Sequence, residues 1–228
     1  MAKPPAPRSS PQEIERFLQR SKNISSFVAR QPRLVFAIDA TASRQPTWDN
    51  ACQVQQEMFL ATREIASLAV QLVYYRGFQQ LCASPWLTDS EQLSRLMSSV
   101  YCEGGRTQIG RLLRHALVEH RQLPVRALVF IGDAMEENPD SLGDLAGQCG
   151  LHGLPLFLFQ EGRQAVVERT FRSMAKLSGG AFARFDNRSA GALAALLGAV
   201  ARYAAGGRAA LENSGEASAR QLLEQLKP

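Results

Sequence analysis

Residues 33–43, Arg-Leu-Val-Phe-Ala-Ile-Asp-Ala-Thr-Ala-Ser, decide the fold, because a continuous apolar run stops abruptly at Asp39. The five apolar residues 34–38 are too few for a helix, and Val, Phe and Ile favour a strand. Since no polar residue alternates within the run, we expect both faces of this strand to be buried, as they are in a parallel sheet.

The same kind of segment returns along the chain and alternates with helical periodicity. The pattern predicts further strands over 68–75, 81–86, 126–131, 154–159 and 181–185. It predicts helices over 11–20, from Pro46 onward, and over 89–98 (N-cap Thr88), 107–121, 140–151, 163–177 and 188–204, the last ended by Gly206 and Gly207. This order predicts an α/β fold, a three-layer, Rossmann-like arrangement with a mostly parallel central sheet and helices on both faces.

The 228 residues are expected to form one domain with two short extensions. Residues 1–31 are interpreted as an N-terminal arm with a short helix, 32–206 as the domain, and 207–228 as a tail. The tail contains a small amphipathic stretch with Leu222, Leu223 and Leu226.

Charge and cysteine content exclude several classes of function. The chain has 26 Lys and Arg against 21 Asp and Glu, but they form no basic run of the kind that binds nucleic acid, which we therefore consider an improbable partner. The four cysteines show no metal-binding spacing. The longest uncharged apolar stretch, 190–201, is too short to span a bilayer, and the N-terminus resembles no secretory signal. We therefore expect a cytoplasmic protein without membrane insertion.

Polar side chains follow the predicted strands where a parallel sheet binds ligands, beyond the carboxyl ends. The first strand ends in Asp39, Thr41 and Ser43, and the strand over 126–131 is followed by Asp133. A Gly-Gly turn at 104–105 leads to Thr107. These are two carboxylates and three hydroxyls, and hard cations such as Mg²⁺ prefer oxygen ligands.

Three segments of the sequence resemble the motifs of the von Willebrand factor A (VWA) domain family. They are Asp39-Ala-Thr-Ala-Ser43, residues 104–110 (Gly-Gly-Arg-Thr-Gln-Ile-Gly) and residues 129–133 (Val-Phe-Ile-Gly-Asp). They occur in the family's order within residues 33–204. The resemblance implies the VWA fold and a metal-ion-dependent adhesion site (MIDAS) that holds Mg²⁺ or Mn²⁺.

The resemblance also implies roles for individual residues. The metal ligands would be Asp39, Thr41, Ser43, Thr107 and Asp133, with the aspartates acting largely through water. A rim around the ion would contact the partner, and it would consist of Arg44, Gly105, Arg106, Glu136 and Glu137. The chain departs from the family at Thr41, where Ser is more usual. Glu136 and Glu137 are unexpected beside a site that awaits a carboxylate, which they would repel or replace.

The leading hypothesis is a non-catalytic module that binds an acidic side chain of a partner protein through the ion, with no enzyme activity. By family analogy the partner would be a AAA+ ATPase or a multi-protein complex. A second hypothesis is a divalent-metal-dependent hydrolase or phosphotransferase that uses Glu136 or Glu137 as a base. A third is a metal-free scaffold that binds through its terminal helices.

Overall fold

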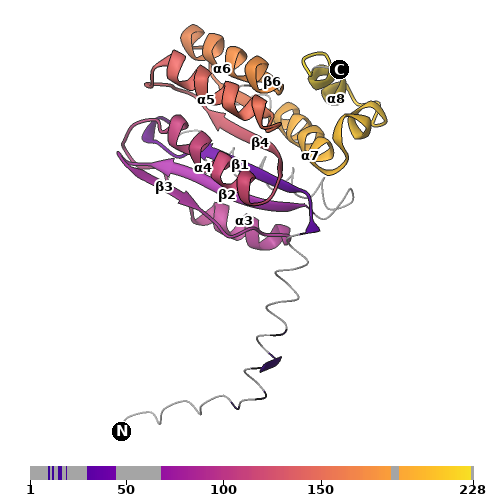
Figure 1. Cartoon of the computed structure of the whole chain (residues 1–228). Helices are drawn as coiled ribbons and strands as arrows, with labels where there is room; N and C mark the ends of the chain where they lie inside the picture. Colours follow the sequence, from indigo (N-terminus) through magenta and orange to yellow (C-terminus); the bar gives the residue numbers. More distant parts are fainter. Residues whose placement is uncertain are drawn as a thin grey trace.

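The structure, a computed structural model, describes residues 30–44, 68–185 and 190–226, together with residues 10, 12, 15, 16 and 19. The helices expected over 11–20 and from Pro46 fall largely or wholly outside these residues. The described elements, drawn in Figure 1, are β1 (Arg33–Asp39), the 3₁₀ turn η1 (Ala42–Arg44), β2 (Ala69–Arg76), β3 (Gln80–Ala83), α3 (Ser90–Ser99), α4 (Ile109–Gln122), β4 (Val125–Gly132), α5 (Pro139–Leu151), β5 (Leu156–Glu161), α6 (Ala165–Ser178), β6 (Ala181–Phe185), α7 (Ala190–Glu212) and α8 (Ala217–Leu223).

The strands form one sheet in the order β3-β2-β1-β4-β5-β6. All neighbouring pairs are parallel except β2 and β3, which form an antiparallel hairpin at one edge. The predicted α/β class and the mostly parallel sheet are therefore confirmed. Because β1 lies between β2 and β4, the chain that leaves its carboxyl end is flanked by both neighbours.

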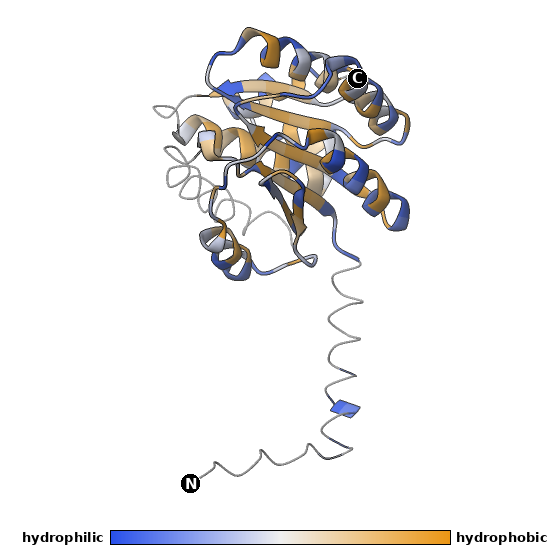
Figure 2. Ribbon diagram, turned by 90° about the vertical axis from the view of Figure 1, so that its left-hand side faces the viewer, coloured by the Kyte–Doolittle hydropathy of each residue, from blue (hydrophilic) through white to orange (hydrophobic). Residues whose placement is uncertain are grey.

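Two apolar layers enclose the sheet, as the orange strands between blue outer helix faces show in Figure 2. Helices α4, α5 and α6 pack on one face, while α3, α7 and α8 pack on the other. All seven residues of β1 are buried, which explains why its apolar run does not alternate with polar residues. No helix within the described ranges combines the length and the hydrophobicity needed to cross a membrane.

Two helix boundaries differ from the sequence expectations. Helix α3 is capped by Asp89, whose side chain accepts a hydrogen bond from Glu91 N, and not by Thr88. Gly206 and Gly207 do not end the helical stretch. The chain bends at Gly207 (φ 68°, ψ −161°), a conformation that glycine adopts readily, and helical residues resume as far as Glu212.

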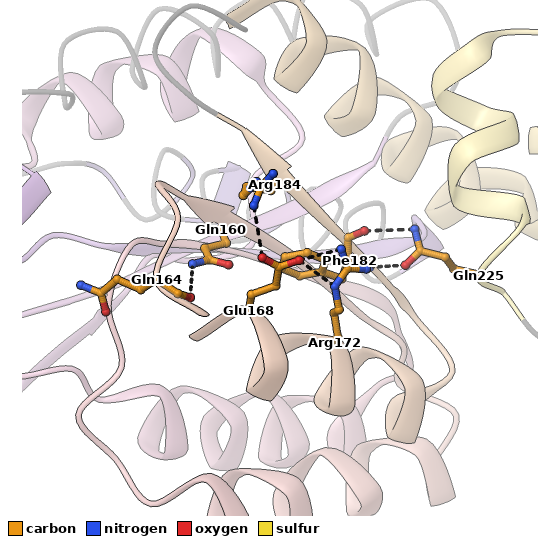
Figure 3. Close-up of polar contacts among 7 residues, drawn as sticks. All are labelled: Gln160, Gln164, Glu168, Arg172, Phe182, Arg184 and Gln225. Carbon is orange, nitrogen blue, oxygen red and sulfur yellow. Dashed lines mark hydrogen bonds and ion pairs between the residues drawn. The ribbon is translucent and has the colours of Figure 1, made fainter. Parts of the chain in front are cut away.

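The segment after this bend packs onto the rest of the described chain. Leu211, Ala219, Leu222 and Leu226 are buried in the same cluster as the strands. Figure 3 shows how Gln225 meets the edge strand β6: its side-chain oxygen accepts from Phe182 N (2.9 Å), and its amide nitrogen donates to Phe182 O (3.0 Å). The side chain thus satisfies one residue of the edge as a neighbouring strand would.

We expect Leu222→Ala to lower the free energy of unfolding by about 2–5 kcal/mol, because it removes a fully buried side chain and leaves a cavity. Urea denaturation measures the change. The matched control is Leu151→Ala, since Leu151 is 88% exposed and its truncation should cost less than about 0.5 kcal/mol. Equal small losses in both variants would show that the C-terminal segment is not part of the cooperative core.

Candidate metal centre at the carboxyl edge of the sheet

Asp39 ends β1 as a fully buried carboxylate that is held at both oxygens. Oδ1 accepts a hydrogen bond from Thr41 N (2.8 Å), and Oδ2 accepts one from the hydroxyl of Tyr75 (3.0 Å). Tyr75 is the register partner of Asp39 on β2. The first bond turns the chain immediately after the strand, and the second fixes the plane of the carboxylate.

The turn brings the two hydroxyls of the first motif together. Thr41 Oγ1 and Ser43 Oγ lie 3.1 Å apart, at hydrogen-bonding distance. Thr41 is buried, whereas Ser43 is exposed. The pair therefore reaches from the buried end of β1 toward the surface.

Asp133 follows β4 and lies close to Asp39. A Cβ atom built on the intervening Gly132 would lie 3.6 Å from Asp39 Cβ. Burial raises the pKa of the Asp39 carboxyl, and the nearby charge of Asp133 raises it further. Asp133 Oδ1 is itself buried and has no hydrogen-bond partner. Such an orphaned acceptor is costly in a protein interior unless a ligand or water satisfies it.

The loop of the second motif is bound to both other segments. Glu103 N donates to Ala40 O (3.0 Å), which places this loop beside the first motif. Gly105 lies against the chain at Gly77, where a Cβ atom would be 1.9 Å from Gly77 O, so only glycine allows this approach. Thr107 is buried at the end of the loop.

Glu136 and Glu137 bind main-chain groups around Thr107. Glu136 accepts from Thr107 N (3.2 Å) at Oε2, and its own N–H donates to Thr107 Oγ1 (3.0 Å). Glu137 accepts from Ile109 N (2.8 Å) and Gly110 N (2.7 Å), and so caps the first turn of α4. A carboxylate there also interacts favourably with the helix dipole. These bonds join the third segment to the second.

The structure thus brings Asp39, Thr41, Ser43, Thr107 and Asp133 into three contacting segments at one edge of the sheet. Among the expected rim residues, Gly105 packs on Gly77, and Arg106 is exposed while its main-chain N–H donates to Gly77 O (3.1 Å). The side chain of Arg44 lies outside the described part.

Sequence reasoning missed Tyr75, which is fully buried and whose pKa is raised well above its usual value by burial and by the Asp39 carboxylate. The available signal was its position at the end of the second predicted strand, where a polar tip can reach the end of the first.

The donor set fits a hard cation. Two neighbouring carboxylates are present, and within the described ranges neither forms an ion pair. A cation would satisfy the orphaned Asp133 oxygen and offset the repulsion between the carboxylates. No group of three or more His, Cys, Asp or Glu side chains in the described part could hold a metal, so the three hydroxyls are essential to this interpretation.

No family sequence model matches the chain, and no curated protein matches its sequence. Solved structures match its fold. The von Willebrand factor type A protein from Catenulispora acidiphila aligns with a TM-score of 0.60 and 16% identity over 74% of this chain and 42% of its own. The VWA domain of SpRpn10 gives 0.56 and 10% over 69% and 89%. The pilus adhesin SpaC from Lactobacillus rhamnosus GG gives 0.60 and 9% over 76% and 30%.

These likenesses, together with the sheet order, show that the protein has the VWA fold, as the motifs predicted. The chain spans less than half the length of the Catenulispora and SpaC chains. At these identities the comparisons establish the fold alone.

The raised pKa of Asp39 predicts a pH-dependent cost in metal-free protein. Between the ordinary pKa of an unfolded Asp, about 4, and the higher native value, the native state binds more protons than the unfolded state. Stability therefore falls as pH rises through this window, and the deficit persists above it. In EDTA we expect Asp39→Asn to be more stable than the wild type at pH 8, and to lose this advantage as the pH falls to about 4.

Thermal unfolding across this pH range measures the difference between the two proteins. Asp144→Asn, which neutralises an exposed carboxylate on α5, serves as the control and should show no such trend. An Asp39→Asn protein that is less stable than the wild type at every pH would show that hydrogen bonding outweighs the burial of charge.

Proposed function

We propose that the protein is a non-catalytic interaction module that binds an Asp or Glu carboxylate of a partner protein through a divalent ion, Mg²⁺ or Mn²⁺. One observation carries this proposal: Asp133 Oδ1 is buried without a partner beside the buried carboxylate of Asp39. A site that gathers uncompensated negative charge and hydroxyls is suited to a hard cation.

The residues that would hold the ion are Asp39, Thr41, Ser43, Thr107 and Asp133. The bound ion would supply a coordination position that a carboxylate can fill. The chain's own contribution is orientation. Thr41 N and Tyr75 fix the carboxylate of Asp39. The reciprocal bonds between Thr107 and Glu136 fix the second loop.

Two observations favour binding over catalysis. The carboxylates of Glu136 and Glu137, the residues considered as bases, already accept hydrogen bonds from main-chain N–H groups. Among the proteins of similar fold, one is named an adhesin. A AAA+ ATPase or another multi-protein complex is the kind of partner we propose, in the cytoplasm, where the thiols of Cys82 and Cys149 would stay reduced.

The use of terminal helices for binding receives less support. The apolar residues of the C-terminal stretch, Leu222 and Leu226, are buried against the domain. They are therefore already used in packing. The N-terminal helix expected over 11–20 lies largely outside the described residues.

Saturating Mg²⁺ is expected to raise the melting temperature of the wild type by about 5 °C relative to EDTA, because a ligand that binds only the native state stabilises it. Ser43→Ala and Asp133→Asn should each abolish most of this shift. Differential scanning calorimetry measures it.

The matched controls are Ser98→Ala on α3 and Asp144→Asn on α5, two exposed positions that carry the same chemical changes. Both should keep the full shift. An unchanged melting temperature in Mg²⁺ and in Mn²⁺ would contradict a metal site and would favour the metal-free scaffold.

Affinity capture from the source cell, with the wild type and with Asp133→Asn as baits, tests the role of the ion in binding. Specific partners should be retained by the wild type in Mg²⁺ and released by EDTA, and the variant should not retain them. If every partner survives chelation, the adhesion-site mechanism is wrong although the fold stands.

A further inference from the structure

Two large aromatic side chains are exposed close to the candidate metal centre. Phe78, in the turn between β2 and β3, is 73% exposed, and Tyr101, just before the second-motif loop, is 58% exposed. Aromatic side chains that remain in water beside a binding site are typical anchors of protein interfaces.

The turn that carries Phe78 is held against the second-motif loop. Gly77 O accepts from Arg106 N (3.1 Å) and from the side-chain amide of Gln108 (3.3 Å). Gly105 packs directly on Gly77. Figure 1 shows the β2–β3 connection on the same side of the sheet as the start of α4. Phe78 is therefore fixed beside the loop that positions Thr107.

Tyr101 is also fixed by its neighbours. The guanidinium carbon of Arg76 lies 3.9 Å from the centre of its ring, a cation–π contact. Arg76 in turn forms an ion pair with Glu103 (3.5 Å), and Glu103 is paired with Thr41 through a β-bridge. A continuous series of contacts thus joins the first metal motif to the Tyr101 ring. A side chain that is already ordered loses little entropy when a partner covers it.

The charge around these rings is positive. Arg106 and Arg111 are exposed, and the structure shows no ion pair for either with the described acidic residues. Arg111 instead donates to Gln79 O and to the side-chain oxygen of Gln108 (2.6 Å each). Glu136, the acidic group nearest this rim, turns its carboxylate onto Thr107 N.

We propose that Phe78, Tyr101, Arg106 and Arg111 form the surface that selects the partner, and that they bind an acidic protein segment with an aromatic side chain near its metal-binding carboxylate. The inference rests on the proposed function of the same site. A chain extends by about 3.3–3.6 Å per residue, so a separation of two to four residues lets one segment reach both places. The arginines would complement the acidic character of the segment.

Two labelled peptides test this proposal by fluorescence anisotropy in Mg²⁺. The first, Gly-Ser-Asp-Gly-Phe-Ser-Gly, offers a carboxylate and an aromatic ring, and the second replaces Phe by Ser. The full chain should bind the first at least about fivefold more tightly, since an aromatic anchor contributes about 1 kcal/mol or more. Phe78→Ser or Tyr101→Ser should reduce this preference to less than about twofold, with the residual affinity still sensitive to EDTA.

Leu151→Ser is the matched control, because it removes an 88% exposed side chain at the other end of a helix and should keep the preference. The melting shift in Mg²⁺ should be intact in Phe78→Ser, which separates loss of the anchor from loss of the ion. Equal affinity for both peptides, or binding of neither by a protein that shows the Mg²⁺ shift, would overturn this inference and leave the metal site standing.

Absence of both the shift and peptide binding would mean that the proposed function itself fails, and this inference with it. An oligothymidylate is the remaining probe, since aromatic rings beside arginines also bind single-stranded nucleic acid. Oligothymidylate binding that is tighter than peptide binding and is lost in Phe78→Ser would overturn the protein partner proposed here.

Discussion

The buried carboxylate of Asp39 is the constraint on which this edge of the molecule depends. A carboxylate that loses all contact with water must recover its solvation from the protein, and here Thr41 N and the Tyr75 hydroxyl supply part of it. The nearby Asp133 adds repulsion and an oxygen with no partner. The protein alone therefore leaves an unfavourable balance, and a cation would remove it.

The sheet order makes this concentration of charge geometrically feasible. A central strand of a parallel sheet must release its chain between two neighbours, so its first polar residue is enclosed from both sides. The second-motif loop then closes over this point only because Gly105 lets it approach Gly77. The site is thus made by backbone contacts between loops, while the helices fix where each loop begins and ends.

The sequence predicts the central strands and the meeting of Asp39 with Asp133, because continuous apolar runs and the carboxyl-end rule are local signals that a parallel sheet converts into proximity. It does not predict the contacts of Tyr75, Glu136 and Glu137. A tyrosine at a strand end looks like ordinary core, and a glutamate after a strand looks like surface. Which helix N-terminus a loop carboxylate will cap depends on the path of the loop in space, for which the sequence carries no period. The bend at Gly207 escaped for a similar reason, since a glycine pair can either end a helix or redirect it.

The same contacts divide the charges of the site into two layers. Glu136 and Glu137 turn inward onto the main chain around α4, where they compensate its first N–H groups. Their charge is thereby largely spent on the protein itself, and the exposed groups at this rim are arginines. The feature that looked least compatible with a carboxylate-binding site, two glutamates beside it, thus serves to organise the loop. Negative charge inside favours a cation, and positive charge outside favours an acidic partner, so both layers direct the site toward the same class of ligand.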